Sequence, residues 1–277
     1  MTILDLDLFF DDGERKGPPS VKVYEAKAST ALSKSSLPGL DFCLNPYIGC
    51  EHGCIYCFAP DVVRRQRETW SSEVGYRSNI PVLLNRELRT KRGTIGIGTV
   101  TDPYQPLERL LLLTRKCLLE IARHDNPISI LTKSDLVLRD IELIRSTARP
   151  EVGVTITTMD ADLASRIEPK ASPPVARVET LRRLADSGIE CYAMVGPVLP
   201  FLEQQEIREL LGAIAATGCK RVMADRLRMR PGLEMAFLTA NIVRSKGVLS
   251  DPYRAEMSVR LVRDECTRMG MRFETAF

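Results

Sequence analysis

No stretch of this sequence is apolar for the roughly 18 residues that a membrane-spanning helix needs. Aromatic residues make up only 6% of the chain, too few to suggest a platform on which the bases of single-stranded nucleic acid stack. The amino-terminal segment lacks the basic start and the small-residue cleavage site of a signal peptide, and carries Asp5, Asp7, Asp11 and Asp12 instead. We therefore expect a cytoplasmic protein with no membrane partner.

Neither sign of charge dominates, because 39 basic residues face 36 acidic ones and leave a formal net charge of +3. Such a balance argues neither for nor against nucleic acid, so only local clusters of charge are informative. Arg226, Arg228 and Arg230 alternate after a predicted strand, where their guanidinium groups would suit phosphate or carboxylate. Solvated surface positions are the alternative explanation for these arginines.

Segments typical of strands alternate with helical segments along most of the chain. The expected strands are 42–48, 94–100, 127–132, 152–157, 190–195 and 221–225. This alternation predicts parallel β/α units with right-handed crossovers. Six units are fewer than the eight of a closed barrel, so we expect an α/β fold: a partial (β/α)6 TIM-like barrel, open along one side.

Loop signals set the first residues apart from this pattern. Residues 1–40 contain Gly, Pro and Ser clusters and are expected to form an N-terminal extension. Residues 41–277 are expected to form the barrel and, from Asp251 onward, a C-terminal helix. Among the helices, one apolar face is predicted from Leu107, Leu110, Leu111, Leu118 and Ile121.

Three of the eight cysteines fall within eight residues, in the run Cys50-Glu-His-Gly-Cys54-Ile-Tyr-Cys57. In a cytoplasmic protein such cysteines are thiols or metal ligands rather than disulfides. Three thiolates would leave one iron of a four-iron cluster without a protein ligand. The alternatives are a structural zinc site completed by His52 or Cys43, which would make the protein an interaction module, and plain buried cysteines.

Further motifs fall in order at the ends of the expected strands. They are Leu44-Asn-Pro-Tyr-Ile-Gly before the cysteines, Gly98-Thr-Val-Thr-Asp102-Pro-Tyr-Gln-Pro106, Thr132-Lys133-Ser134, Glu168-Pro169 and Val195-Gly-Pro197. With the cysteine run, they make the chain resemble the radical S-adenosylmethionine superfamily, in its spore-photoproduct-lyase-like or "DNA repair photolyase" branch.

The resemblance implies a 4Fe–4S cluster on Cys50, Cys54 and Cys57 at the carboxyl ends of the strands, and S-adenosylmethionine as cofactor. Reductive cleavage of that cofactor would give a 5′-deoxyadenosyl radical that abstracts hydrogen from a substrate. A reductant such as flavodoxin or ferredoxin is an implied partner. The positions that match cofactor contacts of the family are Thr101, Asp102, Lys133, Thr157, Val195 and Gly196.

The substrate is where the match fails. In the spore DNA lyases a cysteine returns hydrogen to the product radical, and the matching position here is Thr99. Those lyases also have a tyrosine where this chain has Phe58, whereas Tyr56 matches a tyrosine of their relay. Cys191 is the candidate substitute hydrogen donor, with burial as an apolar core residue as its alternative. The substrate is thus expected to be either a nucleic-acid lesion or a small molecule or peptide.

Overall fold

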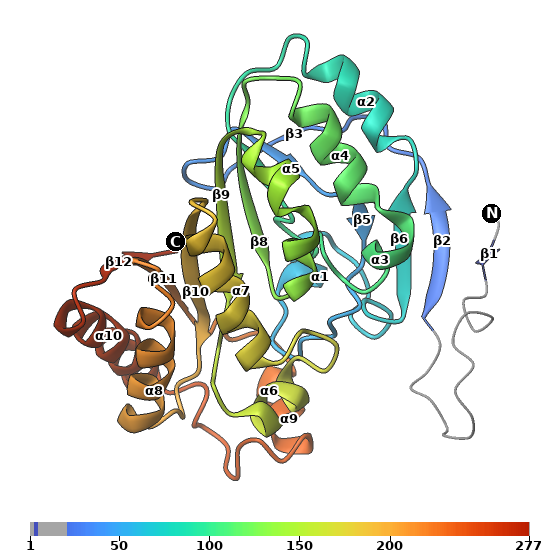
Figure 1. The fold of residues 1–277 in the computed structure, drawn as a ribbon. Coiled ribbons are helices and arrows are strands. Elements are labelled where there is room, and N and C mark those ends of the chain that lie inside the picture. The colour runs from blue at the N-terminus through green and yellow to red at the C-terminus, as the bar shows by residue number, and fades with distance from the viewer. Residues whose placement is uncertain (1–2, 5–20, 277) are drawn as a thin grey trace, which may run out of the picture. The chain divides into compact units, whose positions relative to one another are not determined.

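The computed structural model describes residues 3–4 and 21–276 (Figure 1). Its described residues divide into two compact units: those up to residue 53, with 57–130 and 142–149, form the first, and residues 54–56, 131–141 and 150–276 form the second. Part of the predicted extension, residues 1–2 and 5–20, lies outside the described residues. No helix in the described part of the chain is long and apolar enough to span a membrane.

Two groups of strands build the first unit. Its elements, some of which run past the unit boundary, are β1 (Ile3–Leu4), β2 (Lys22–Ala26), β3 (Ser33–Lys34), β4 (Phe42–Leu44), β5 (Tyr47–Ile48), α1 (Ala59–Val62), β6 (Glu73–Arg77), α2 (Ile80–Glu87), β7 (Ile95–Ile97), α3 (Glu108–Leu111), α4 (Leu113–Ile121), β8 (Pro127–Thr132) and α5 (Ile141–Arg145). β4, β7 and β8 run parallel in that order, while β1, β2, β6 and β5 form a separate small sheet. The predicted extension therefore supplies β2 and β3 to these sheets.

The expected strand 42–48 is two strands in the structure. β4 ends at Leu44 and β5 begins at Tyr47, which pairs antiparallel with Tyr76 in the small sheet. Asn45 and Pro46 lie between them, and Pro46 has no N–H to continue the ladder of β4. The chain thus leaves the parallel sheet just before the cysteine run.

The apolar helix face predicted from Leu107 to Ile121 is partly wrong. Leu112 adopts a left-handed conformation with φ 53° and separates α3 from α4. Leu118 and Ile121 are buried as expected, but Leu110 is 47% exposed. Residues at helical spacing lie on one face only within a continuous helix, so the spacing fails across the break at Leu112.

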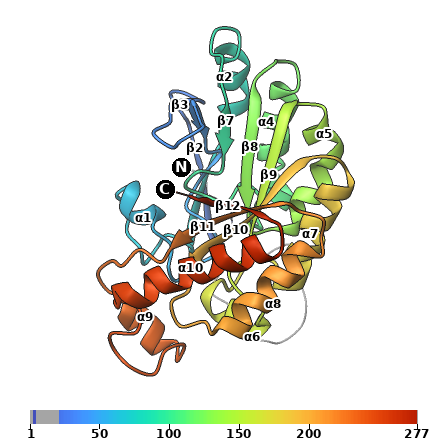
Figure 2. The same cartoon turned by 90° about the vertical axis from the view of Figure 1, so that its left-hand side faces the viewer.

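Parallel strands with helices between them make up the second unit. Its elements are η2 (Asp135–Asp140), β9 (Ala148–Thr155), α6 (Ala161–Ile167), α7 (Pro174–Asp186), β10 (Glu190–Val198), α8 (Gln204–Ala215), β11 (Arg221–Arg226), α9 (Leu233–Thr239), α10 (Pro252–Arg268) and β12 (Arg272–Thr275). β9, β10, β11 and β12 are parallel neighbours in that order. α7 packs on β10, and α10 packs on β11 and beside α8 (Figure 2).

The helix expected from Asp251 onward is confirmed as α10. Asp251 caps α10 and Asp160 caps α6, each accepting hydrogen bonds from the first backbone N–H groups of its helix. Leu181 and Leu184 of α7 are fully buried. β12, which follows α10 and pairs with β11, was not expected. The prediction of an α/β fold with a mostly parallel sheet is confirmed.

Candidate active site

The cysteine run lies in a tight turn after β5. Gly49 and Gly53 adopt positive φ angles of 81° and 63°, which residues with a side chain rarely adopt. A Cβ at Gly49 would lie 2.8 Å from the carbonyl oxygens of both Trp70 and Glu73. The N–H of Cys50 donates to that same Trp70 oxygen at 3.0 Å. Only glycine therefore lets the chain turn here and bring Cys50 against the segment before β6.

The last part of the run is held by a second set of contacts. Cys57 is fixed within the first unit by Arg67, which donates to the Cys57 carbonyl oxygen at 2.6 Å and pairs with Asp61. Residues 54–56 instead belong to the second unit. There the N–H of Ile55 donates to the Ile167 carbonyl oxygen at 3.0 Å, and Arg230 donates to the carbonyl oxygen of Ile55.

The chemistry of the donors fits a metal centre. Cys50, Cys54 and Cys57 are partly exposed cysteines outside any disulfide, whereas Cys117, Cys219 and Cys266 are buried. Thiolates of this kind are the usual ligands of iron–sulfur clusters. Within the described residues, no three His, Cys, Asp or Glu side chains already converge as a metal-binding set. The three cysteines are therefore assigned by their type and spacing, and their role as ligands stays a prediction.

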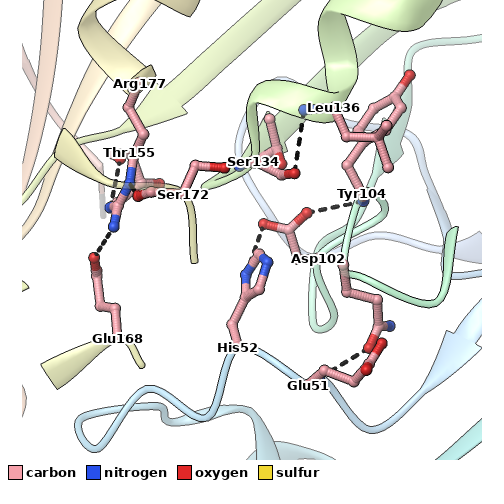
Figure 3. A network of polar contacts seen from close by, with 12 residues as sticks. Glu51, His52, Asp102, Tyr104, Ser134, Leu136, Thr155, Glu168, Ser172 and Arg177 are labelled. Carbon is pink, nitrogen blue, oxygen red and sulfur yellow. Dashed lines mark hydrogen bonds and ion pairs between the residues drawn. The ribbon is translucent and has the colours of Figure 1, made fainter. Parts of the chain in front are cut away.

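His52 is engaged in a different contact. It is buried, and its Nδ1 lies 3.4 Å from Oδ2 of Asp102, in the loop after β7 (Figure 3). The other carboxylate oxygen of Asp102 accepts the N–H of Tyr104 at 2.9 Å. His52 thus acts as a loop residue that contacts Asp102. Beside it, the hydroxyl of Thr101 is buried and has no hydrogen-bond partner in the described part of the chain, as expected of a group reserved for a ligand.

A buried glutamine ties the same loop to the cysteine run. Gln105 accepts the N–H of Glu51 at 2.9 Å and donates to the carbonyl oxygen of Gly49 at 3.3 Å. The Glu51 carboxylate accepts the N–H of Leu107 at 2.6 Å. These bonds fix the backbone on both sides of Cys50. We did not single out Gln105 as a site residue, although it lies within the motif that continues from Asp102.

The second unit contains a buried ion pair beside Tyr56. Glu168 and Arg177 approach to 2.5 Å, with 0% and 2% of their side chains exposed (Figure 3). The hydroxyl of Tyr56 donates to Glu168, and that of Thr157 does so at 3.4 Å. Burial alone would raise the pKa of Glu168, but the charges of Arg177 and Lys133 outweigh it and lower that pKa. Burial and the charge of Glu168 raise the pKa of Tyr56 well above its usual value.

Three of the predicted site residues come together around this pair. Lys133 directly follows β8, and its ammonium group lies 5.6 Å from the centre of the Tyr56 ring. Thr157 lies two residues after β9 and, like Tyr56, bonds to Glu168. Tyr56, Lys133 and Thr157 thus share one neighbourhood in the second unit, centred on Glu168.

The remaining predicted residues lie on β10. Val195 is buried, and a Cβ at Gly196 would meet only the flexible end of the Met194 side chain, at 2.5 Å. Both residues are in the carboxyl-terminal half of the strand, whereas Cys191 is its second residue. A hydrogen bond between the Cys191 and Cys219 thiols lowers the pKa of Cys219 to about 7 and raises that of Cys191. The role of Cys191 as a hydrogen donor stays a prediction.

Sequence reasoning missed Arg177 altogether and used Glu168 only as part of a motif. One signal was available. Arg177, Leu181 and Leu184 follow the helical spacing of a single face, and the two leucines are fully buried. A charged residue at a core position of this kind needs a buried counter-ion, and the nearby Glu168 supplies it.

Comparisons with known proteins agree with this geometry. The family model of the radical SAM superfamily matches residues 44–222, more than half of the chain. An uncharacterized protein of Methanocaldococcus jannaschii is 35% identical over 66% of this chain and 70% of its own length. An uncharacterized protein of Mycobacterium tuberculosis is 31% identical over 84% of this chain and 73% of its own length.

Solved structures show the same fold at low sequence identity. Spore photoproduct lyase complexed with dinucleoside spore photoproduct superposes with a TM-score of 0.71 and 13% identity, covering 92% of this chain and 82% of the lyase. SuiB of Streptococcus suis bound to S-adenosylmethionine gives a TM-score of 0.53 and 15% identity, covering 84% of this chain and 49% of SuiB. The fold is therefore of the radical SAM partial-barrel type, as predicted.

Proposed function

This chain belongs to the radical SAM superfamily and is an enzyme of that class rather than a zinc-binding interaction module, and we propose that Cys50, Cys54 and Cys57 hold its 4Fe–4S cluster. The cluster and S-adenosylmethionine would supply a reductive cleavage whose 5′-deoxyadenosyl radical abstracts hydrogen from the substrate. The observation that carries this proposal is the set of three partly exposed cysteines within one eight-residue segment, whose chain turns at Gly49 and Gly53.

The protein's own residues support the metal centre by fixing the turn around it. Gln105 and Glu51 hold the backbone beside Cys50, and Arg67 holds the carbonyl group of Cys57. Bonds of this kind orient ligands before a metal arrives, which lowers the cost of assembling a site. They also keep backbone N–H groups engaged in a part of the chain that has no regular secondary structure.

For S-adenosylmethionine, the proposed contacts are Thr101, Asp102, Lys133, Thr157, Val195 and Gly196. The ammonium group of Lys133 suits a carboxylate, and the unbonded hydroxyl of Thr101 offers a free donor or acceptor. Asp102 and Thr157 already accept or donate bonds within the protein, so they would orient neighbouring groups as well as contact a ligand. A flavodoxin or ferredoxin is the proposed source of the electron.

The test is anaerobic reconstitution of the wild type and of a variant with Cys50, Cys54 and Cys57 changed to alanine. We expect the variant to lose bound iron and the formation of 5′-deoxyadenosine. Cys266→Ala, which removes a buried thiol of α10, is the matched control and should keep both. Cys43→Ala and His52→Ala should also keep the bound iron, because a fourth protein ligand at the cluster would contradict the proposal.

For the substrate, we propose a nucleic acid that carries a lesion or modified base, on the likeness to the lyase solved with dinucleoside spore photoproduct. The reaction should differ from that lyase's, because Thr99 offers no thiol and its hydroxyl accepts a bond from Asn45 at 2.9 Å. The second candidate, a small molecule or peptide, is favoured by the exposure of Phe58, which presents an apolar ring without a hydroxyl.

Binding to duplex and single-stranded oligonucleotides at rising salt distinguishes these substrates. A nucleic-acid substrate predicts binding that weakens steeply with salt, since phosphate contacts release counterions. No binding to either form at low salt would contradict the nucleic acid and leave the small molecule or peptide.

A further inference from the structure

We propose that Glu168 and Arg177 are positioning residues for the cysteine run, and that they act through Tyr56 to hold residues 54–56 in the conformation needed for cluster assembly. The proposal rests on the function proposed above for Cys54 and Cys57. It assigns a role to an ion pair that neither the spacing of the cysteines nor the family match identifies.

Tyr56 is the link between the ion pair and the run. It lies two residues after Cys54 and directly before Cys57, so the position of its ring constrains the backbone that carries both thiols. Its side chain is buried and its hydroxyl donates to Glu168. A buried phenol that is bonded at its tip loses most of its freedom to rotate, and so does the peptide to which it is attached.

Arg177 anchors Glu168 in turn. Besides the ion pair, its guanidinium group donates to the carbonyl oxygens of Ser172 at 2.6 Å and Thr155 at 3.1 Å. These oxygens belong to the loop before α7 and to the last residue of β9. The planar fork of arginine is thus engaged in three directions, which makes it a rigid support for the Glu168 carboxylate.

A backbone contact supports the same segment next to Glu168. The N–H of Ile55 donates to the carbonyl oxygen of Ile167, the residue that precedes Glu168. Two consecutive residues therefore hold the run: Ile167 accepts a bond from its backbone, and Glu168 accepts a bond from the Tyr56 hydroxyl. Any shift of Glu168 would be passed to residues 54–56 by both routes.

The burial of the pair favours positioning over direct chemistry. With 0% and 2% of their side chains exposed, Glu168 and Arg177 have no surface to offer a substrate. Each already has an opposite charge as its partner. A group that is enclosed in this way acts on a reaction through the residue it holds, which here is Tyr56.

The experiment uses the full-length protein in two states, with the variants Glu168→Gln, Arg177→Met and Tyr56→Phe. In metal-free protein, hydrogen–deuterium exchange is followed in the peptide that contains residues 54–57. We expect exchange there to be faster by about tenfold in Glu168→Gln and Tyr56→Phe, as when a buried polar group loses its partner. After anaerobic reconstitution, we expect bound iron per chain to fall in the same variants.

Glu265→Gln is the matched control, because it breaks the pair between Glu265 and Arg208, 2.8 Å apart, on α10 and α8 of the same unit. It should leave both exchange near Cys54 and iron content unchanged. If Arg177→Met fails to fold, Tyr56→Phe still decides, because it keeps the ion pair and removes only the hydroxyl that donates to Glu168. In Tyr56→Phe, exchange that rises equally in α10 would indicate general destabilisation and overturn the proposal.

The remaining outcomes of the exchange and iron measurements also test the proposal. Unchanged exchange in Glu168→Gln and Tyr56→Phe would show that the pair does not order the run. Faster exchange with full iron content would show that the order is not needed for the cluster, which also overturns the proposal. Failure of the wild type itself to bind iron would contradict the proposed function, whereas the exchange experiment would still decide whether Glu168 and Arg177 order residues 54–56.

Discussion

Two arginines of the second unit lie at opposite ends of its strands, and their surroundings differ sharply. Arg177 bonds to the last residue of β9 and pairs with a fully buried carboxylate. Arg221, the first residue of β11, pairs with Glu151, Glu190 and Glu274 and lies 4.8 Å from the centre of the Tyr192 ring. Of these three carboxylates, Glu190 is 68% exposed, whereas Glu168 at the other end is 0% exposed.

The difference shows that pairing an arginine with a carboxylate has no fixed energetic value. Around Arg221, the three carboxylates are 26% to 68% exposed, so the remaining partners and the solvent compensate in part when one partner is lost. At Glu168 there is no solvent to replace Arg177, so the loss of either partner leaves an uncompensated charge in the interior. The costly pair lies at the carboxyl ends of the strands, the end at which barrel enzymes carry their active sites.

Arg177→Met should have the largest effect on stability. It keeps the apolar volume of the side chain but leaves Glu168 buried without its counter-ion, so we expect the free energy of unfolding to fall by about 3–5 kcal/mol. Urea denaturation of the metal-free protein measures this. The double variant Arg177→Met with Glu168→Leu should recover much of the loss, because no buried charge remains. A single variant as stable as the wild type would contradict the interior charge pair.

The second-largest expected effect is that of Glu168→Gln on the pH dependence of stability. The pKa of Glu168 in the folded protein lies below its usual value of 4.5, so the ion pair stabilises the fold fully above that pH. As the pH falls through the folded pKa, the carboxylate takes up a proton and this stabilisation is lost. Glu168→Gln, which cannot titrate, should therefore lose stability less steeply than the wild type below pH 4.5. Parallel curves for the two proteins in acid would contradict this assignment.

The same comparison explains how far the sequence predicted the molecule. The sequence predicts the cysteine run, the strand ends near Lys133 and Thr157 and the helix that begins at Asp251, because each depends on neighbours in the chain or on the period of one element. The contact of Tyr56 with Glu168 joins residues 112 positions apart, and no local pattern encodes it. The break at Leu112 was missed because a left-handed residue other than glycine leaves no mark in composition.

At Arg221 the expected effect on stability is smaller. Arg221→Met removes charges that are partly solvated and a cation–π contact, so we expect a loss of about 1–2 kcal/mol. Raising the salt concentration should reduce the difference between the variant and the wild type, because screening weakens the pairs that the variant lacks. The effect of Arg177→Met should depend little on salt. If the stability losses of Arg221→Met and Arg177→Met depended equally on salt, the difference in solvent screening between the two ends of the strands would be contradicted.

Cys191→Ala should have the smallest effect on stability, within about 1 kcal/mol, and should act instead on its neighbour. Cys219 owes its pKa of about 7 first to the hydrogen bond with Cys191, so removing that thiol should move the pKa upward, toward the usual 9.0. The midpoint of the pH–rate profile for alkylation of Cys219, followed by peptide mass spectrometry, measures the shift and does not depend on how accessible the thiol is. An unchanged midpoint would show that Cys191 does not bond to Cys219. A raised midpoint places Cys191 with Arg221 among the residues that join the amino ends of the strands.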